Sequence, residues 1–266
     1  MEYKDITFEI SDPQAVITLN RPDKLNAFTF DTLDEIYHAV GQAVAAKSVV
    51  GIIITGSGRG FCAGLDSASL SDATGNGQTH ASYQKEDNLP GLFSYFTECP
   101  KPIITAINGV AAGGGLVMTL LSDVRIAARS ASFTTVFLKR GLVAEHGSSW
   151  TLPRLVGTGR ALDLLFTSDR ITAEQAHEFG LVQKLVEDEI LVETAKQYVQ
   201  TIAASAAPEA LAASKRMVYG HAGSNFNDAL RQAETIQNRF VKLGDAAEGA
   251  AALAEKRAPK FERIGE

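Results

Sequence analysis

The chain has 266 residues, 45% hydrophobic and 21% charged, with a formal net charge of −6 at pH 7, and this length suits one large or two small domains. The acidic balance, without any basic block, argues against nucleic acid or anionic membranes as partners. Its two cysteines lack zinc-ligand spacing and no apolar run reaches about 18 residues, so we expect a cytoplasmic protein without a metal site, a cofactor or a membrane span.

The first part of the chain alternates between strand and helix patterns. Short apolar runs rich in β-branched residues predict strands at 6–10, 15–19, 49–55, 102–107, 123–128 and 181–186. Helical periodicity or capping residues predict helices at 31–46, 82–96, 116–121, around Trp150, at 160–166 and from 173 to 180. Small polar residues over 67–80 predict a mobile loop.

From residue 189 onward the pattern is helical, with breaks at Pro208, near 220–224, at Gly244 and at Pro259. The layout therefore predicts an α/β core over residues 1–188 and a helical region over 189–266. Amphipathic helices in that region either cover the core or form a subunit interface.

Two buried strands end in glycine-rich turns of the same design. The strand over 49–55 leads to Ala63 and Gly64, and the strand over 102–107 leads to Gly113–Gly115. Backbone N–H groups of such turns suit a developing negative charge, so two of them converging on one oxygen would form an oxyanion hole. The competing interpretations are tight backbone packing and dinucleotide binding, but Phe61 replaces the third glycine of the dinucleotide fingerprint.

Several ordered segments resemble those of one enzyme family. They are Asn20-Arg-Pro-Asp-Lys-Leu-Asn26, Gly56-Ser-Gly-Arg-Gly-Phe-Cys-Ala-Gly-Leu-Asp66, Lys101-Pro with the later Asn-Gly-Val-Ala-Ala-Gly-Gly-Gly115, and Arg170-Ile-Thr-Ala-Glu-Gln-Ala176. Together they resemble the enoyl-CoA hydratase/isomerase, or crotonase, family over nearly the whole chain. The resemblance implies an α/β spiral of ββα units with a C-terminal helical trimerisation region, a homotrimer or homohexamer, and an acyl-CoA thioester as substrate.

The resemblance also implies roles for individual residues. By match, the oxyanion-hole N–H groups fall on Ala63 and Gly114. Substrate contacts are expected at Lys24, Leu25, Ala27, Leu65, Asp66, Leu116, Val117, Phe137, His146, Trp150 and Lys256. Lys256 would reach the CoA from the helical tail. A site of this kind stabilises a thioester enolate and then needs only a base, or an acid–base pair, above the acyl chain.

The chain departs from the hydratase pattern where two glutamates would hold a water molecule. Val117 and Phe137 stand at those positions, and neither can transfer a proton. Glu145 is the replacement candidate, in a turn that resembles the corresponding turn of enoyl-CoA delta-isomerases, which use a single glutamate. Apolar neighbours such as Trp150 would partly desolvate its carboxylate. We therefore expect double-bond isomerisation with Glu145 as the base.

Other interpretations stay open at this point. Glu145 could instead activate water in an enoyl-CoA hydratase or an acyl-CoA hydrolase, or it could merely cap the helix after Gly147. His146 is a second candidate for the chemistry, although a lone histidine is more often structural. A chain with both oxyanion loops but neither hydratase glutamate could also be a catalytically silent acyl-CoA-binding protein.

Overall fold

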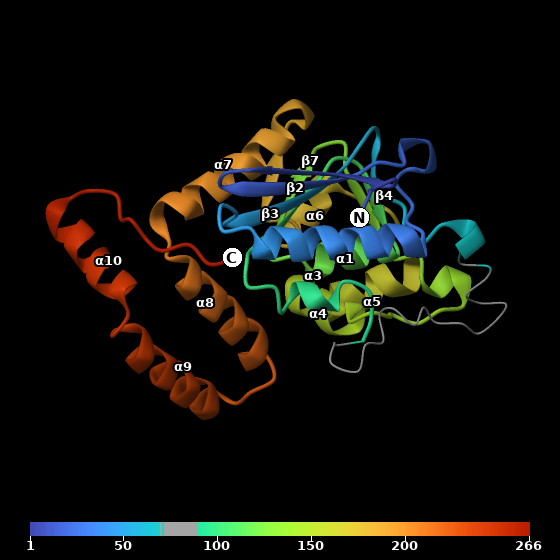
Figure 1. Ribbon diagram of the computed structural model, residues 1–266. Helices are drawn as coiled ribbons and strands as arrows, with labels where there is room; N and C mark the ends of the chain where they lie inside the picture. Colours follow the sequence, from blue (N-terminus) through green and yellow to red (C-terminus); the bar gives the residue numbers. More distant parts are fainter. Residues whose placement is uncertain (70, 72–89) are drawn as a thin grey trace.

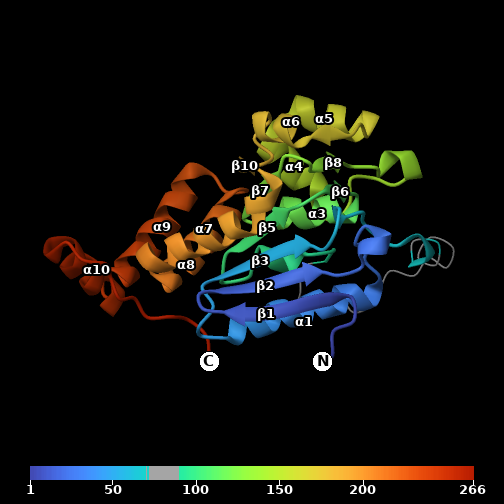
Figure 2. The same ribbon diagram turned by 90° about the horizontal axis from the view of Figure 1, so that it is seen from above.

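The computed structural model describes residues 1–69, 71 and 90–266, and its core contains two sheets (Figure 1, Figure 2). The larger sheet has the strand order β1-β2-β3-β5-β7-β10. These strands are β1 (Ile6–Ser11), β2 (Gln14–Leu19), β3 (Gly51–Gly56), β5 (Ile103–Ile107), β7 (Val124–Ala128) and β10 (Lys184–Val186). β1 and β2 pair antiparallel, and the remaining neighbours pair parallel.

The smaller sheet has the order β4-β6-β8-β9, formed by β4 (Gly60–Cys62), β6 (Val110–Ala112), β8 (Ser132–Thr134) and β9 (Ile171–Thr172). β3, β5 and β7 are each followed by a strand of this second sheet, and helix α3 (Gly114–Leu121) follows β6. The spiral of ββα units expected from the sequence is therefore present. The sequence predicted only loops at β4, β6 and β8, because a three-residue strand is too short to show an alternating pattern.

The central strands of the larger sheet, β3 and β5, are buried on both faces. Ile52 and Ile54 of β3 enter the main core, whereas Ile53 enters a second core with Val199 of α7 (Leu191–Ser205). Successive side chains of a strand point to opposite faces, so a strand buried on both sides is apolar at every position. Helix α1 (Phe30–Ala45) packs against β1 and β2.

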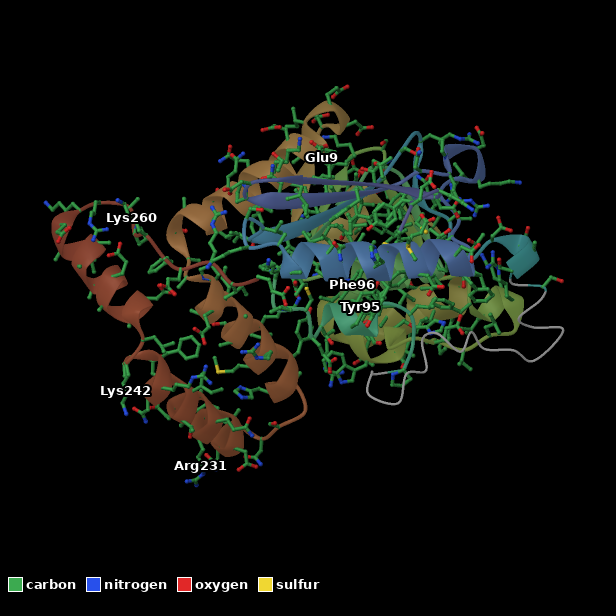
Figure 3. The ribbon with its side chains drawn as sticks, viewed as in Figure 1. Glu9, Tyr95, Phe96, Arg231, Lys242 and Lys260 are labelled. Carbon is green, nitrogen blue, oxygen red and sulfur yellow. The ribbon has the colours of Figure 1, made fainter. Side chains whose placement is uncertain are left out.

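The remaining helices are short or lie at the periphery. They are η1 (Pro22–Lys24), η3 (Ser94–Phe96), η4 (Leu138–Arg140), α4 (Ser148–Val156), α5 (Thr158–Thr167), α6 (Ala173–Glu178), η5 (Asp188–Ile190), α8 (Pro208–His221), α9 (Phe226–Phe240) and α10 (Gly244–Glu255). The predicted capping box at α6 is confirmed, with Thr172 accepting from the Gln175 N–H and the Gln175 side chain accepting from the Thr172 N–H. In Figure 3, Tyr95 and Phe96 of η3 lie beside α1, where the Tyr37 and Tyr95 rings are 4.9 Å apart.

Helices α9 and α10 extend away from the core in both views (Figure 1, Figure 2). α8 is held by the core, because Lys215 Nζ lies 2.7 Å from Asp123 Oδ2 and Tyr219 donates to the same carboxylate. α9 has no buried residue, and its Phe226 is 77% exposed. Arg231 and Lys242 mark the outer side of this arm in Figure 3.

Some expected elements differ in extent. Residues 82–89 of the predicted 82–96 helix lie outside the described residues, and the rest forms only the short turn η3. The strand expected at 181–186 begins at Lys184, because the N–H groups of Leu181 and Val182 donate to Ala176 O at the end of α6. Of the predicted mobile loop, 67–69 and Ser71 are helical and the remainder lies outside the described residues.

The expected boundary between residues 188 and 189 stays a prediction, although α7, which lies beyond it, packs on β3, β5 and β7. None of the helices in the described part of the chain is long and apolar enough to cross a membrane.

Candidate active site

The two glycine-rich turns meet at the N-terminus of α3. A Cβ on Gly115 would lie 2.1 Å from Cys62 O, and a Cβ on Gly64 would lie 2.8 Å from Ala112 O and 3.3 Å from Gly114 N. The neighbouring atoms belong to the backbone and have no freedom to move aside, so only glycine fits. Gly64 also has a φ of 95°, in the left-handed region. The glycines therefore serve the close approach of two backbones.

The donor expected at Ala63 is corrected by the structure. The Ala63 N–H is already committed, since it donates to Leu25 O at 3.0 Å. Leu65 forms a parallel β-bridge with Phe28. The hydrogen bonds of this bridge belong to the two neighbours of Leu65, since Gly64 O accepts from the Phe28 N–H and the Asp66 N–H donates to Phe28 O. In such a bridge the N–H of Leu65 itself faces away from Phe28.

The Leu65 and Gly114 N–H groups have no acceptor among the described residues. Gly114 is the first residue of α3, where a backbone N–H lacks an intrahelical partner. Gly64 joins these two donors, because it precedes Leu65 directly and contacts the Gly114 amide. Leu65, which sequence matching placed among the substrate contacts, is therefore the candidate for the second donor beside Gly114, in place of Ala63. The left-handed backbone conformation of Gly64 could not be predicted from the sequence.

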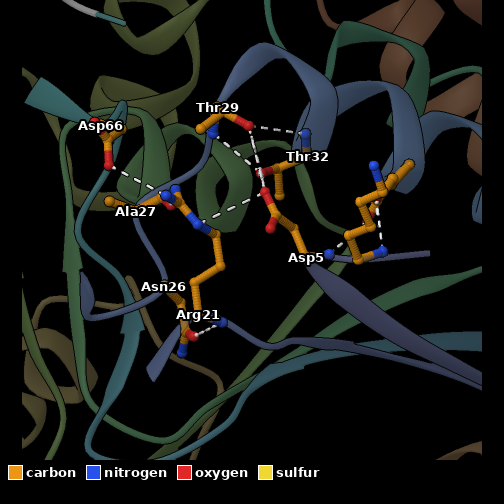
Figure 4. A network of polar contacts seen from close by, with 9 residues as sticks. Asp5, Arg21, Asn26, Ala27, Thr29, Thr32 and Asp66 are labelled. Atoms are coloured by element: carbon orange, nitrogen blue, oxygen red, sulfur yellow. Dashed lines mark hydrogen bonds and ion pairs between the residues drawn. The ribbon is translucent and has the colours of Figure 1, made fainter. Parts of the chain in front are cut away.

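An arginine braces the loop expected to contact CoA (Figure 4). The Arg21 guanidinium lies 3.6 Å from Asp5 Oδ2 and 3.4 Å from Asp66 Oδ2, and it donates to Ala27 O. Asn26 is 2% exposed and donates to Ser57 O and Gly60 O at 2.9 and 2.7 Å. The loop is thereby tied to the glycine-rich turn after β3.

The loop at residues 24–27 lies against the turn after β4, since Leu25 O accepts from the Ala63 N–H and the Arg21 guanidinium joins Ala27 O to Asp66. The substrate contacts expected at Lys24, Leu25, Ala27, Leu65 and Asp66 stay a prediction. Lys24 is exposed, whereas the Asp66 carboxylate is engaged by Arg21.

Glu145 lies in a tight turn before α4. Its carbonyl accepts from the Ser148 N–H at 3.0 Å and from Ser148 Oγ at 2.6 Å. Gly147 is the N-cap of α4, and no side chain makes a capping hydrogen bond there. No hydrogen bond joins the Glu145 carboxylate to the first turn of α4 among the described residues, and its role as a helix cap stays an open alternative. The side chain is 35% exposed, and its Oε2 lies 3.6 Å from His146 Nε2.

Leu92 connects this turn to the oxyanion donors. Its side-chain Cδ1 lies 3.6 Å from where a Cβ on Gly114 would stand, and its N–H donates to His146 Nδ1 at 3.3 Å. One residue thus contacts both halves of the site. Sequence analysis missed it, because a contact between residues 54 positions apart leaves no local pattern.

The other expected substrate contacts divide into two groups. Leu116, Val117 and Phe137 belong to the buried core, at 2%, 0% and 3% exposure. They place no carboxylate or hydroxyl at the positions where hydratases carry glutamates. Trp150 is 37% exposed, and the Arg154 guanidinium stacks on its ring at 3.9 Å from the centroid.

A cavity of about 800 Å³ opens beside the Glu145 turn, and His146, Trp150, Leu121 and Tyr219 are among its lining residues. This volume is within the range typical of small-molecule sites. Among the residues the structure describes, no group of three or more histidine, cysteine or acidic side chains could hold a metal ion.

Lys256 does not lie at the site of its own chain. It is the C-cap residue of α10, and α10 lies well apart from α4 and α5 in both ribbon views (Figure 1, Figure 2). The extension of the helical arm away from the core is the physical reason. Lys256 could therefore reach a CoA molecule only on another copy of the chain.

Comparisons with known proteins agree with this architecture. The chain is 35% identical over 247 residues to the 1,2-epoxyphenylacetyl-CoA isomerase of Escherichia coli K12, covering 92% of this chain and 93% of the relative. It is 32% identical to the short-chain-enoyl-CoA hydratase of Clostridium acetobutylicum, with 97% of each chain covered.

The crystal structure of enoyl-CoA hydratase from Mycobacterium tuberculosis H37Rv superposes with a TM-score of 0.87 at 31% identity, covering 97% of this chain and 98% of that one. The model of the enoyl-CoA hydratase/isomerase family matches residues 9–264. With the two glycine-rich turns joined at Gly64 and a match over nearly its whole length, the chain belongs to the enoyl-CoA hydratase/isomerase family of enzymes.

Proposed function

We propose that this enzyme moves the double bond of an enoyl-CoA thioester from C3 to C2 through an enolate, with Glu145 as the single base. The observation that carries the proposal is the pair of backbone N–H groups at Leu65 and Gly114, which have no acceptor among the described residues. The oxygen of a thioester gains negative charge when its α-proton leaves. Two preorganised donors lower the barrier to that step.

The reaction needs only one carboxylate. Glu145 takes a proton from C2, and the electrons of that C–H bond move to the thioester oxygen held by the two N–H groups. The protonated Glu145 then delivers its proton to C4, and the electrons return to form the double bond between C2 and C3. No water is added and no cofactor is needed, so atoms and electrons balance within the substrate.

The substrate would lie across two loops and a cavity. Residues 24–27 and the turn at Leu65 and Asp66 suit the CoA moiety, with Lys24 free to approach a phosphate. The cavity beside His146 and Trp150 suits the acyl group. Lys256 of a neighbouring copy would contact the CoA moiety, in keeping with the expected homotrimer or homohexamer.

Hydration is the second candidate. The Clostridium relative is named a hydratase, and hydratase is the more common name among the relatives compared. In that case Glu145 would activate a water molecule for addition to C3. Against this stand Val117 and Phe137, which are apolar and buried at the two positions where the hydratases carry their glutamates.

The deciding experiment combines a substrate panel with isotopes. Purified enzyme is incubated with 3-enoyl-, 2-enoyl- and branched acyl-CoA thioesters, in D₂O and in ¹⁸O-water, and the products are identified by mass spectrometry. Isomerisation predicts deuterium at C2 or C4 and no ¹⁸O in the product. Hydratase or hydrolase activity instead predicts ¹⁸O in the product, and a silent binder predicts binding without turnover.

Glu145→Gln keeps the shape of the side chain but removes the base, so turnover should fall by at least about 10²-fold while thioester binding persists. Glu9→Gln is the matched control, since Glu9 is exposed on β1 and receives the same chemical change. Full activity of Glu145→Gln on a proven substrate would place the base elsewhere.

A further inference from the structure

His146 makes contacts on both of its ring nitrogens. Nδ1 accepts from the Leu92 N–H at 3.3 Å, and Nε2 lies 3.6 Å from Glu145 Oε2. The ring and Cα also pack on the Gly91 backbone, where a Cβ would lie 3.4 Å from His146 Cα and 3.5 Å from Nδ1. The imidazole is thus held between the segment at residues 91–92 and the carboxylate of Glu145.

These contacts determine which nitrogen carries the proton. A backbone N–H can only donate, so Nδ1 must present its lone pair to Leu92. The proton of the neutral imidazole is then on Nε2, the atom that faces Glu145. Burial lowers the pKa of His146, and the negative charge of Glu145 opposes that shift. The neutral ring at physiological pH matches this hydrogen-bond pattern.

The backbone at this turn is unusual for a residue with a side chain. His146 has a φ of 53° and Gly147 a φ of 81°, so two successive residues are left-handed. A residue with a Cβ pays roughly 1–2 kcal/mol for that conformation. The Ser148 hydrogen bonds to Glu145 O hold the main chain on the other side. The turn therefore fixes the ring relative to the Glu145 backbone.

We propose that His146 is a positioning residue. Its Nε2–H orients the Glu145 carboxylate, and the contact of its Nδ1 with Leu92 fixes the position of that carboxylate relative to Gly114. This inference rests on the proposed role of Glu145 as the base. A glutamate side chain that is 35% exposed has several rotamers available without such a contact. Misplacing a catalytic group by about 1 Å can cost up to about 10²-fold in rate.

Three substitutions separate positioning from a structural role. His146→Asn suits the left-handed backbone and keeps an acceptor for Leu92, but its amide nitrogen stands at the place of the ring Cδ2 and does not reach the former position of Nε2. His146→Gln places an amide N–H near the former Nε2. His146→Leu removes both contacts.

The midpoint of thermal unfolding, measured at one protein concentration, should decrease from His146→Asn through His146→Gln to His146→Leu. If His146 positions Glu145, kcat should instead fall about 10-fold or more in His146→Asn and His146→Leu and stay close to the wild-type value in His146→Gln. KM should change less than about threefold in all three variants. If kcat follows the order of stability, the residue is only structural and the inference is overturned.

A double substitution separates this inference from the proposed function. In a Glu145→Gln background, His146→Asn should cause no further loss of kcat, because it acts through the carboxylate that is already gone. Loss of turnover in Glu145→Gln alone, with wild-type kcat in all three His146 variants, would leave the base in place and refute the positioning role. Full activity in Glu145→Gln, with reduced activity in His146→Asn, would refute both.

Discussion

Gly64→Ala tests the junction on which the proposed oxyanion hole depends. The new Cβ would lie 2.8 Å from Ala112 O and 3.3 Å from Gly114 N, both backbone atoms. A φ of 95° adds strain for any residue with a side chain. Strain of this kind costs about 1–3 kcal/mol, and overpacking costs about 1–3 kcal/mol. The free energy of unfolding should therefore fall by about 2–6 kcal/mol.

The same substitution should lower turnover beyond its effect on stability. Pushing Ala112 and Gly114 away from the Gly64 loop separates the Leu65 and Gly114 donors, and loss of one such donor typically costs about 10²–10³ in kcat. Urea unfolding followed by circular dichroism gives the first quantity, and steady-state kinetics on the substrate found by the panel gives the second.

Gly41→Ala is the matched control for this test. Gly41 lies on the exposed side of α1 with nothing within 4 Å of a new Cβ. The substitution should stabilise the protein by about 0.5–1 kcal/mol, because alanine favours a helix interior. If Gly64→Ala keeps wild-type stability and turnover, the two turns do not approach as described and the enolate mechanism loses its basis.

Three further predictions concern the loop, the core and the arm. Asn26→Ala should lower the free energy of unfolding by about 1–3 kcal/mol in urea titrations, because Ser57 O loses its donor and Gly60 O keeps only the one from Asn108; a neutral effect would contradict the bracing role. Burial lowers the pKa of Lys101 to about 8 from 10.5, so between these values the unfolded chain binds the extra proton and the contribution of Lys101 to stability should rise with pH, opposed by Cys62 and Cys99, whose pKa burial raises. Lys101→Met, which also removes the Nζ donor to Ala43 O and Ala46 O, should abolish that rise, and an unchanged pH profile would show that the rise has another source. The wild type should sediment as a trimer or hexamer and a variant with lysine at Phe226 and Leu230 on exposed α9 as a monomer; a monomeric wild type would show that the arm has another role.

The sequence predicted elements whose pattern is local and long enough to repeat. The apolar runs of β3 and β5 and the capping box at Thr172 are of this kind. Three-residue strands such as β4 have no period, so they could be inferred only through the resemblance.

The site divides in the same way. The glycine-rich turn before α3 could be singled out from the chain alone, whereas Gly114 and Glu145 were assigned through the resemblance to the family. The choice between Ala63 and Leu65 depends on which peptide faces Phe28, and that is decided by the backbone path at Gly64. The contact from Leu92 to His146 depends on folding two distant segments together.

The use of main-chain donors has a consequence for how such an enzyme tolerates mutation. At Leu65 any residue except proline supplies the same N–H, so side-chain variation there does not delete the donor. Gly64 and Gly115 admit no such variation, because the space for a Cβ is filled by backbone. A saturation library at position 65 should therefore yield many active variants, whereas libraries at 64 and 115 should yield almost none. Directed evolution of this scaffold can vary the side chain at position 65 without rebuilding the hole itself.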